Sequence, residues 1–181
     1  MSLVLIRVFL VTAILLLLAA GAATDMRLRI IPNRVVALVG LAGFTLNVMA
    51  KPGMAWASLL VALILLIALG ALAHFNIIGG GDAKLLAAVT LMAPLDRIGT
   101  LLTEIALAGG LLSAAYFVAH CTFRNTPTAV PSVSGGGFLE HERARIATGK
   151  SVPYALAILA GVGFYVVSEL YQCWSATSCS L

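Results

Sequence analysis

The sequence is poor in charged residues, and this scarcity excludes most classes of soluble protein. Only 10% of its 181 residues are Asp, Glu, Lys or Arg, whereas 61% are hydrophobic. An average soluble domain has about 25% charged and about 45–50% apolar residues. Together with a mean hydropathy of +1.08, the composition excludes an ordinary soluble domain and a disordered chain. It also argues against a nucleic-acid-binding protein of the usual kind, although the net charge is +4.

Cysteine is scarce as well. The chain has three cysteines, Cys121, Cys173 and Cys179, which are too few for a disulfide framework and include no Cys-x-x-Cys pair. No cluster of Cys and His residues has the spacing of a zinc site. The sequence therefore predicts no metal and no other cofactor.

Long apolar segments are what the sequence has in abundance. There are six, most of them hydrophobic all round, and most approach the roughly 20 residues of a membrane-spanning helix. An alternating pattern of period two, as in a membrane β-barrel, is absent. We therefore predict an all-α fold, a polytopic membrane helix bundle of about six transmembrane helices forming a single domain over residues 1–181. The segments are Leu3–Ala23, Val35–Ala50, Ala55–Phe75, Gly79–Leu95, Ile98–Ala119 and Pro153–Tyr171.

The basic residues predict the orientation of these segments. Of the 11 Lys and Arg residues, eight lie in the connections 24–34, 76–84 and 120–152, and only Arg7, Lys51 and Arg97 lie elsewhere. By the positive-inside rule, these three connections are cytoplasmic and both termini face outward. The stretch of about 122–152 is predicted to be a flexible cytoplasmic loop, because its first half is rich in Pro, Ser, Thr and Gly.

The first segment also has some features of a signal peptide. Phe9–Ala23 has the length of a signal-peptide core, and Ala20-Gly21-Ala22 is similar to a cleavage site. Only Arg7 precedes this core, whereas three arginines follow it closely. That asymmetry favours a retained helix that runs from outside to inside.

Two aspartates lie where a membrane protein rarely places acids. Asp25 follows the first segment and Asp82 opens the fourth, so both are expected near the cytoplasmic boundary of the hydrocarbon, where an unpaired carboxylate is costly. Taken alone, each has a structural interpretation: Asp25 pairs with Arg27 or Arg29, and Asp82 caps the helix that follows three glycines. Taken together, they can meet if their helices are neighbours. Two carboxylates in one site cannot both ionise easily, so one retains a proton, and such a pair can hydrolyse a peptide bond without a metal.

The residues around these aspartates resemble a known family. Gly79–Leu85 (GGGDAKL) is similar to the Gly-x-Gly-Asp-x-Lys-Leu motif of type IV prepilin peptidases, which are intramembrane aspartic proteases. Asp25–Asn33 (DMRLRIIPN) resembles the first-aspartate segment of the same family. The length is similar to that of the small, peptidase-only Tad (Flp pilus) branch, and the paired-cysteine segment of the larger, methylating members is missing. Near the last segment, Pro153-Tyr154 resembles a Pro-Tyr-Gly stretch of the small members, with Ala155 in the place of Gly.

The resemblance implies a site, a substrate and a location. The protein is expected to remove the leader peptide of prepilin and pseudopilin precursors at the cytoplasmic face of the bacterial inner membrane. Its partners are then these precursors and the lipid bilayer, with no nucleic acid. Pro32-Asn33 is expected to break the chain and cap the second helix, and Lys84 to extend its ammonium group to the interface. The implied catalytic residues are Asp25 and Asp82, supported by Gly79, Gly81, Lys84, Pro32 and Asn33.

Three other interpretations remain open on the sequence. A preflagellin peptidase would use the same mechanism on a different precursor. A small transporter or channel would use Asp25 and Asp82 to bind cations or relay protons at a helix broken by glycine. Against it, both acids lie near one face and no repeat relates the two halves of the chain. A non-enzymatic assembly subunit would keep both acids in structural pairs.

Overall fold

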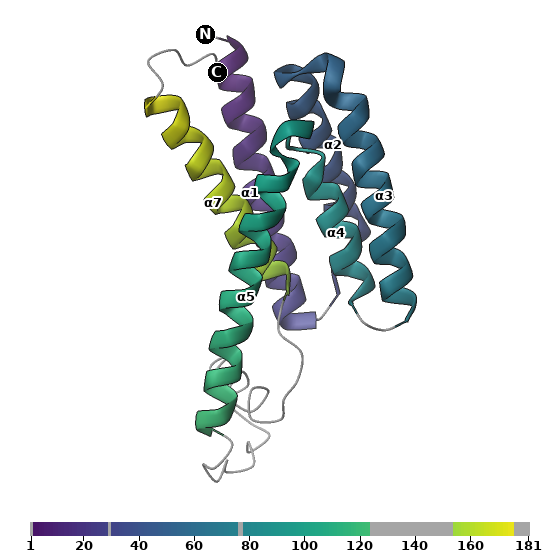
Figure 1. Ribbon diagram of the computed structural model, residues 1–181, viewed down its shortest axis with the longest axis vertical. Coiled ribbons are helices and arrows are strands. Elements are labelled where there is room, and N and C mark those ends of the chain that lie inside the picture. The colour runs from purple at the N-terminus through teal and green to yellow at the C-terminus, as the bar shows by residue number, and fades with distance from the viewer. Residues whose placement is uncertain (1, 29, 76–77, 124–153, 176–181) are drawn as a thin grey trace. The chain divides into compact units, whose positions relative to one another are not determined.

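The computed structural model describes residues 2–28, 30–75, 78–123 and 154–175. Every regular element in this part of the chain is a helix (Figure 1), so the predicted all-α fold is confirmed. The described elements are α1 (Ser2–Leu28), α2 (Asn33–Ala50), η1 (Pro52–Met54), α3 (Ala55–His74), α4 (Gly80–Thr90), η2 (Leu95–Arg97), α5 (Ile98–Phe123) and α7 (Tyr154–Ser175).

The chain divides into two compact units. The first comprises residues 1–108 with 153–181, and so holds α1 to α4, the beginning of α5, and α7. The second comprises residues 109–152 and holds the rest of α5. The predicted loop at about 122–152 falls almost wholly outside the described residues, but α5 continues as a helix through residue 123.

Five helices are long and apolar enough to cross a membrane, and they confirm the predicted membrane helix bundle. They cover Leu3–Leu28, Asn33–Ala50, Pro52–His74, Leu95–Cys121 and Tyr154–Gln172. Their outer faces are apolar too. On α3, for example, the exposed fractions of Leu60, Ile64 and Ile67 are 61%, 64% and 66%. Lipid, unlike water, imposes no cost on such surfaces.

The fourth predicted segment, Gly79–Leu95, is not one continuous span. Its helix α4 has 11 residues, or about 16 Å at 1.5 Å per residue, whereas the hydrocarbon is about 30 Å thick. After Thr90 the next three backbone N–H groups donate to carbonyls three residues earlier, as in a 3-10 turn. Pro94 follows, and it cannot continue a helix because it lacks an N–H group. The segment is therefore shorter than a membrane-spanning helix, which agrees with the short, interrupted segment between Gly79 and Pro94 in the sequence.

The short helix and the turn after it run alongside α2 in the same direction. At one end Lys84 Nζ donates to Asn33 Oδ1 at 3.4 Å, and at the other Lys51 Nζ lies 2.8 Å from Asp96 Oδ2. Lys51 lies 18 residues after Asn33 in the chain, whereas Asp96 lies only 12 residues after Lys84. The shorter segment covers the same length because it leaves the α-helix after Thr90, and an extended chain rises more per residue.

In the turn after α4, the N–H groups of residues 91–93 and the Ala93 carbonyl have hydrogen-bond partners within the protein. Asn47 of α2 is fully buried, and its Nδ2 donates to the Ala93 carbonyl at 3.0 Å. A Cβ at Gly43 would lie 3.0 Å from the Met92 nitrogen, so glycine is what lets the turn contact α2 this closely. Non-helical backbone is tolerated at membrane depth only where the protein supplies such partners.

Helix α4 lies at the centre of the first unit. It contacts α2, α3 and α7, and Figure 1 shows it between α3 and the pair α1 and α7. Helix α4, whose first turn carries Asp82, is therefore packed against neighbouring helices on several sides. The fully buried large side chains of the core are Ile14, Leu18, Val39, Leu85, Val89, Leu101, Ile105, Ile158 and Val162.

Candidate active site

Asp25 lies within the last turn of α1. The first apolar segment of the sequence ends at Ala23, but α1 continues to Leu28 and includes Asp25. The residue is only 8% exposed, whereas Arg27 is exposed. The helix ends before Ile31-Pro32, because a proline disfavours helical backbone in the residue that precedes it. Burying an acid in an apolar bundle costs free energy, so a buried acid is more typical of a functional residue than of a solvated surface residue.

Asp82 lies in the first turn of α4 and is half-buried. The N-cap of this helix is Gly79, in extended backbone with φ −64° and ψ 130°. The Asp82 side chain folds back toward it, since a Cβ on Gly79 would lie 2.7 Å from Asp82 Oδ2. Glycine at position 79 therefore makes the space that the carboxylate occupies. The acid lies at the positive end of the helix dipole. The supporting role of Gly79 in the reaction stays a prediction.

The structure brings the two predicted motifs into contact. A Cβ on Gly81 would lie 3.3 Å from the Cβ of Ile31, so α4 begins directly against the linker between α1 and α2. Beside this contact, Lys84 Nζ donates to Asn33 Oδ1 at 3.4 Å. The stretches 25–33 and 79–85 therefore form one continuous region at one end of the bundle.

The predicted roles of Pro32 and Asn33 are only partly correct. Pro32 breaks the chain between α1 and α2 as expected, but Pro32 itself is the N-cap of α2, and no side-chain hydrogen bond caps this helix. Asn33 is the first helical residue, and its side-chain oxygen accepts from Lys84 instead. Lys84 is exposed, as expected, and it also links the two motifs.

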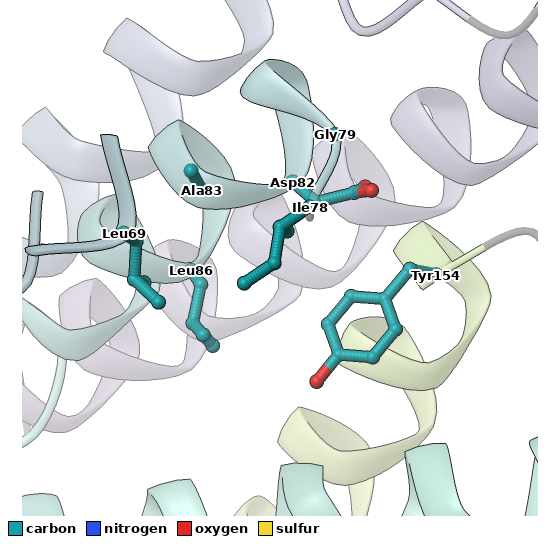
Figure 2. Close-up of a pocket in the computed structure, with 7 residues that line it drawn as sticks. All are labelled: Leu69, Ile78, Gly79, Asp82, Ala83, Leu86 and Tyr154. Carbon is teal, nitrogen blue, oxygen red and sulfur yellow. The ribbon is translucent and has the colours of Figure 1, made fainter. Parts of the chain in front are cut away.

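A pocket of about 370 Å³ opens beside Asp82. Figure 2 shows the side chains that line it, which come from α3, from α4 and the residues before it, and from the first turn of α7. Asp82 and Tyr154 are the only polar side chains among these lining residues, and the others are Leu69, Ile78, Gly79, Ala83 and Leu86. The Pro-Tyr pair at 153–154 is a point of family resemblance in the sequence, but Tyr154 is not among the predicted site residues.

Acids and bases pair at the opposite end of the bundle. Lys51 forms an ion pair with Asp96, and Arg97 Nη1 lies 3.1 Å from Glu169 Oε1. Asp96 therefore lies next to the C-terminal end of α2, whereas the two motifs lie at the other end of that helix. It is not a third member of the candidate site.

The arrangement suits acid–base chemistry at a carbonyl group. One acid is buried, the other faces a pocket that is open to a ligand, and the two motifs that carry them touch. Within the described ranges, no three His, Cys, Asp or Glu side chains are grouped as a metal ion would need. That the site needs no metal stays a prediction.

Comparison with known proteins gives one match. The model of the type IV leader peptidase family matches residues 10–118, a range that includes both Asp25 and Asp82 and ends before α7. No curated protein and no solved structure shows significant similarity to the chain.

Proposed function

The chain belongs to the type IV leader peptidase family, whose model matches more than half of its residues, and we propose that it is an intramembrane aspartic endopeptidase. Its substrates are type IV prepilins and pseudopilins of the Flp type, and Asp25 and Asp82 are its catalytic residues. The observation that carries the proposal is the contact between the two aspartate-bearing motifs, through Gly81 against Ile31.

The proposed reaction is hydrolysis of one peptide bond. The ionised member of the pair takes a proton from a water molecule, whose oxygen bonds to the scissile carbonyl carbon, while the protonated member donates a hydrogen bond to the carbonyl oxygen. The carbon–nitrogen bond then breaks, and the nitrogen receives the proton that the aspartate pair took from the water. The products are a leader with a free carboxylate and a mature protein with a free amine.

The charge distribution supports cleavage at the cytoplasmic face. Arg27, Arg34 and Lys84 are exposed at the end of the bundle that carries the two motifs. At the opposite end, Lys51 and Arg97 are both paired with acids. Lys and Arg residues accumulate in the cytoplasmic connections of membrane proteins whether or not acids pair with them, and eight of the 11 lie in the connections 24–34, 76–84 and 120–152. The motif end is therefore proposed to be cytoplasmic and both termini to face outward.

Neutral replacement of each aspartate tests the proposal. Asp25→Asn and Asp82→Asn keep the side-chain volume but remove the charge and the shared proton. Each should lower kcat/KM for cleavage of an Flp-type prepilin by at least about 10³-fold, and the double variant should be little worse, because the two groups act as a unit. Cleavage is measured by mass shift of the precursor in proteoliposomes.

Asp96→Asn is the matched control. It removes an acid whose partner is Lys51, both half-exposed at the far end, and such surface pairs contribute about 0–1 kcal/mol. It should cleave like the wild type. Full activity of either Asp25→Asn or Asp82→Asn would refute the catalytic pair and require another acid in its place.

A further inference from the structure

The pocket beside Asp82 has one charged corner and an otherwise apolar wall. Leu69 of α3 and Leu86 of α4 line it from one side, together with Ile78 from the segment before α4. Figure 2 shows the ring of Tyr154 across from these side chains. A volume of about 370 Å³ accommodates a side chain rather than a helix. The chemistry of the wall therefore selects an apolar side chain that sits next to the carboxylate.

The depth of the pocket indicates which part of a substrate enters it. Leu86 lies one helical turn beyond Asp82, and Leu69 lies five residues before the end of α3 at His74. Both lie on the bundle side of the carboxylate, away from the exposed basic residues at the motif end. If the leader peptide of the substrate lies at the motif end, the residues before the scissile bond lie outside this pocket. In the precursors that the family resemblance implies, a hydrophobic helix follows the leader, so the residue after the bond is expected to point into the bundle.

Resting on the proposed function, we propose that this pocket binds the side chain of the residue immediately after the scissile bond, and that Tyr154 determines which side chains fit. The pocket takes apolar side chains of medium size. It excludes acidic ones, because they would lose hydration against Leu69, Leu86 and Ile78 and lie beside the carboxylate of Asp82, which has the same charge.

The ring of Tyr154, and not its hydroxyl group, is the part that acts. In Figure 2 the hydroxyl oxygen is directed away from the Asp82 carboxylate, toward the apolar side of the pocket. Tyr154 is the first residue of α7, and the next residue, Ala155, is fully buried. This anchors the backbone from which the ring projects. Tyr154 is thus a specificity-determining wall and not an acid or base of the reaction.

A substrate series measures this preference. Four prepilins carry Ala, Leu, Phe or Glu immediately after the scissile bond, and kcat/KM is determined for each with the full-length protein in proteoliposomes. The wild type should prefer Leu over Ala by about tenfold and over Glu by at least about 100-fold, which are typical values for an apolar specificity pocket. Equal rates for all four substrates would overturn the proposal.

Variants of the wall separate its role from general damage. Tyr154→Ala should lose the preference for Leu over Ala, whereas Tyr154→Phe should keep it because the ring is intact. Leu69→Phe fills the pocket and should disfavour the Phe substrate while sparing Ala. Tyr171→Ala removes an exposed tyrosine from the other end of α7 and should leave the ranking unchanged. Loss of the ranking in Tyr154→Phe or in Tyr171→Ala would contradict the assignment.

A binding experiment keeps this proposal distinct from the proposed function. A prepilin with p-benzoylphenylalanine after the scissile bond is irradiated with the Asp82→Asn protein, and the cross-linked peptide is identified by mass spectrometry. Cross-links to Leu69, Leu86 or Tyr154 support the pocket even if the wild type cleaves no prepilin, a result that would refute only the proposed function. Cross-links to the apolar groove of α2 and α3 around Phe44 and Leu63, or none, would overturn the pocket assignment.

Discussion

Gly81 is the point at which the two motifs touch, so its replacement tests whether their spacing controls activity. An added Cβ would lie 3.3 Å from the Cβ of Ile31 and 3.4 Å from its Cδ1. A Cβ is fixed to the backbone, and isoleucine is stiff at its first side-chain torsion. Ile31 therefore cannot rotate away, and a larger residue at position 81 moves the linker after Asp25 relative to α4.

The expected loss of activity follows from the size of that movement. Gly81→Ala requires a shift of a few tenths of an ångström, whereas Gly81→Leu brings three further carbon atoms into the same contact. A displacement of about 1 Å between reacting groups costs about 100-fold in rate. We expect Gly81→Leu to lower kcat/KM for prepilin cleavage by about 100-fold, and Gly81→Ala by less than about tenfold.

Gly80 provides the matched control. It lies in the same turn of α4, and a Cβ there has no neighbour within 4 Å. Gly80→Leu therefore changes helix propensity as Gly81→Leu does, but it makes no contact with Ile31. Cleavage rates are measured in proteoliposomes, and thermal unfolding of each purified variant verifies folding. Adding Ile31→Ala to Gly81→Leu should restore part of the activity, because it makes room for the new side chain. Equal activity of Gly81→Leu and Gly80→Leu would refute the reasoning.

Two further predictions concern stability. Gly161→Ala should lower the free energy of unfolding by about 1–3 kcal/mol, because the new Cβ would lie 2.8 Å from the backbone nitrogen of Ile105. Gly163→Ala is the control and should be neutral or stabilising, because a Cβ there has no neighbour within 4 Å. Chemical unfolding in detergent compares the two variants. Asn47→Leu removes the donor to the Ala93 carbonyl and should destabilise by about 1–2 kcal/mol in the same assay.

Thr45→Ala serves as the control for Asn47→Leu. The Thr45 hydroxyl donates only to the Leu41 carbonyl of its own helix and is exposed, so its loss should change the free energy of unfolding by less than about 0.5 kcal/mol. Similar losses of stability in the Thr45 and Asn47 variants would contradict the role assigned to Asn47. Similar losses in the Gly161 and Gly163 variants would contradict the close contact of Gly161 with Ile105.

The membrane-spanning helices and the two aspartates were predictable from the sequence. Apolar composition over about 20 residues is sufficient to identify a spanning helix, because lipid contact imposes no finer pattern. Asp25 and Asp82 stand out because acids are rare and costly in such a chain. Their flanking motifs lie within nine residues of chain or fewer, so local sequence was enough to identify them.

Only the tertiary structure decided how the fourth segment ends and what surrounds Asp82. Hydropathy records that Gly79–Leu95 is apolar, but not that Asn47 satisfies the Ala93 carbonyl and so permits the chain to leave the helix after Thr90. The pocket likewise depends on Tyr154, which lies 72 residues after Asp82 in the chain and faces the same pocket. Contacts of this kind are set by packing between helices, for which a single sequence holds no periodic signal. The sequence thus determined the membrane fold and its two acids, whereas helix packing decided where they lie and what they face.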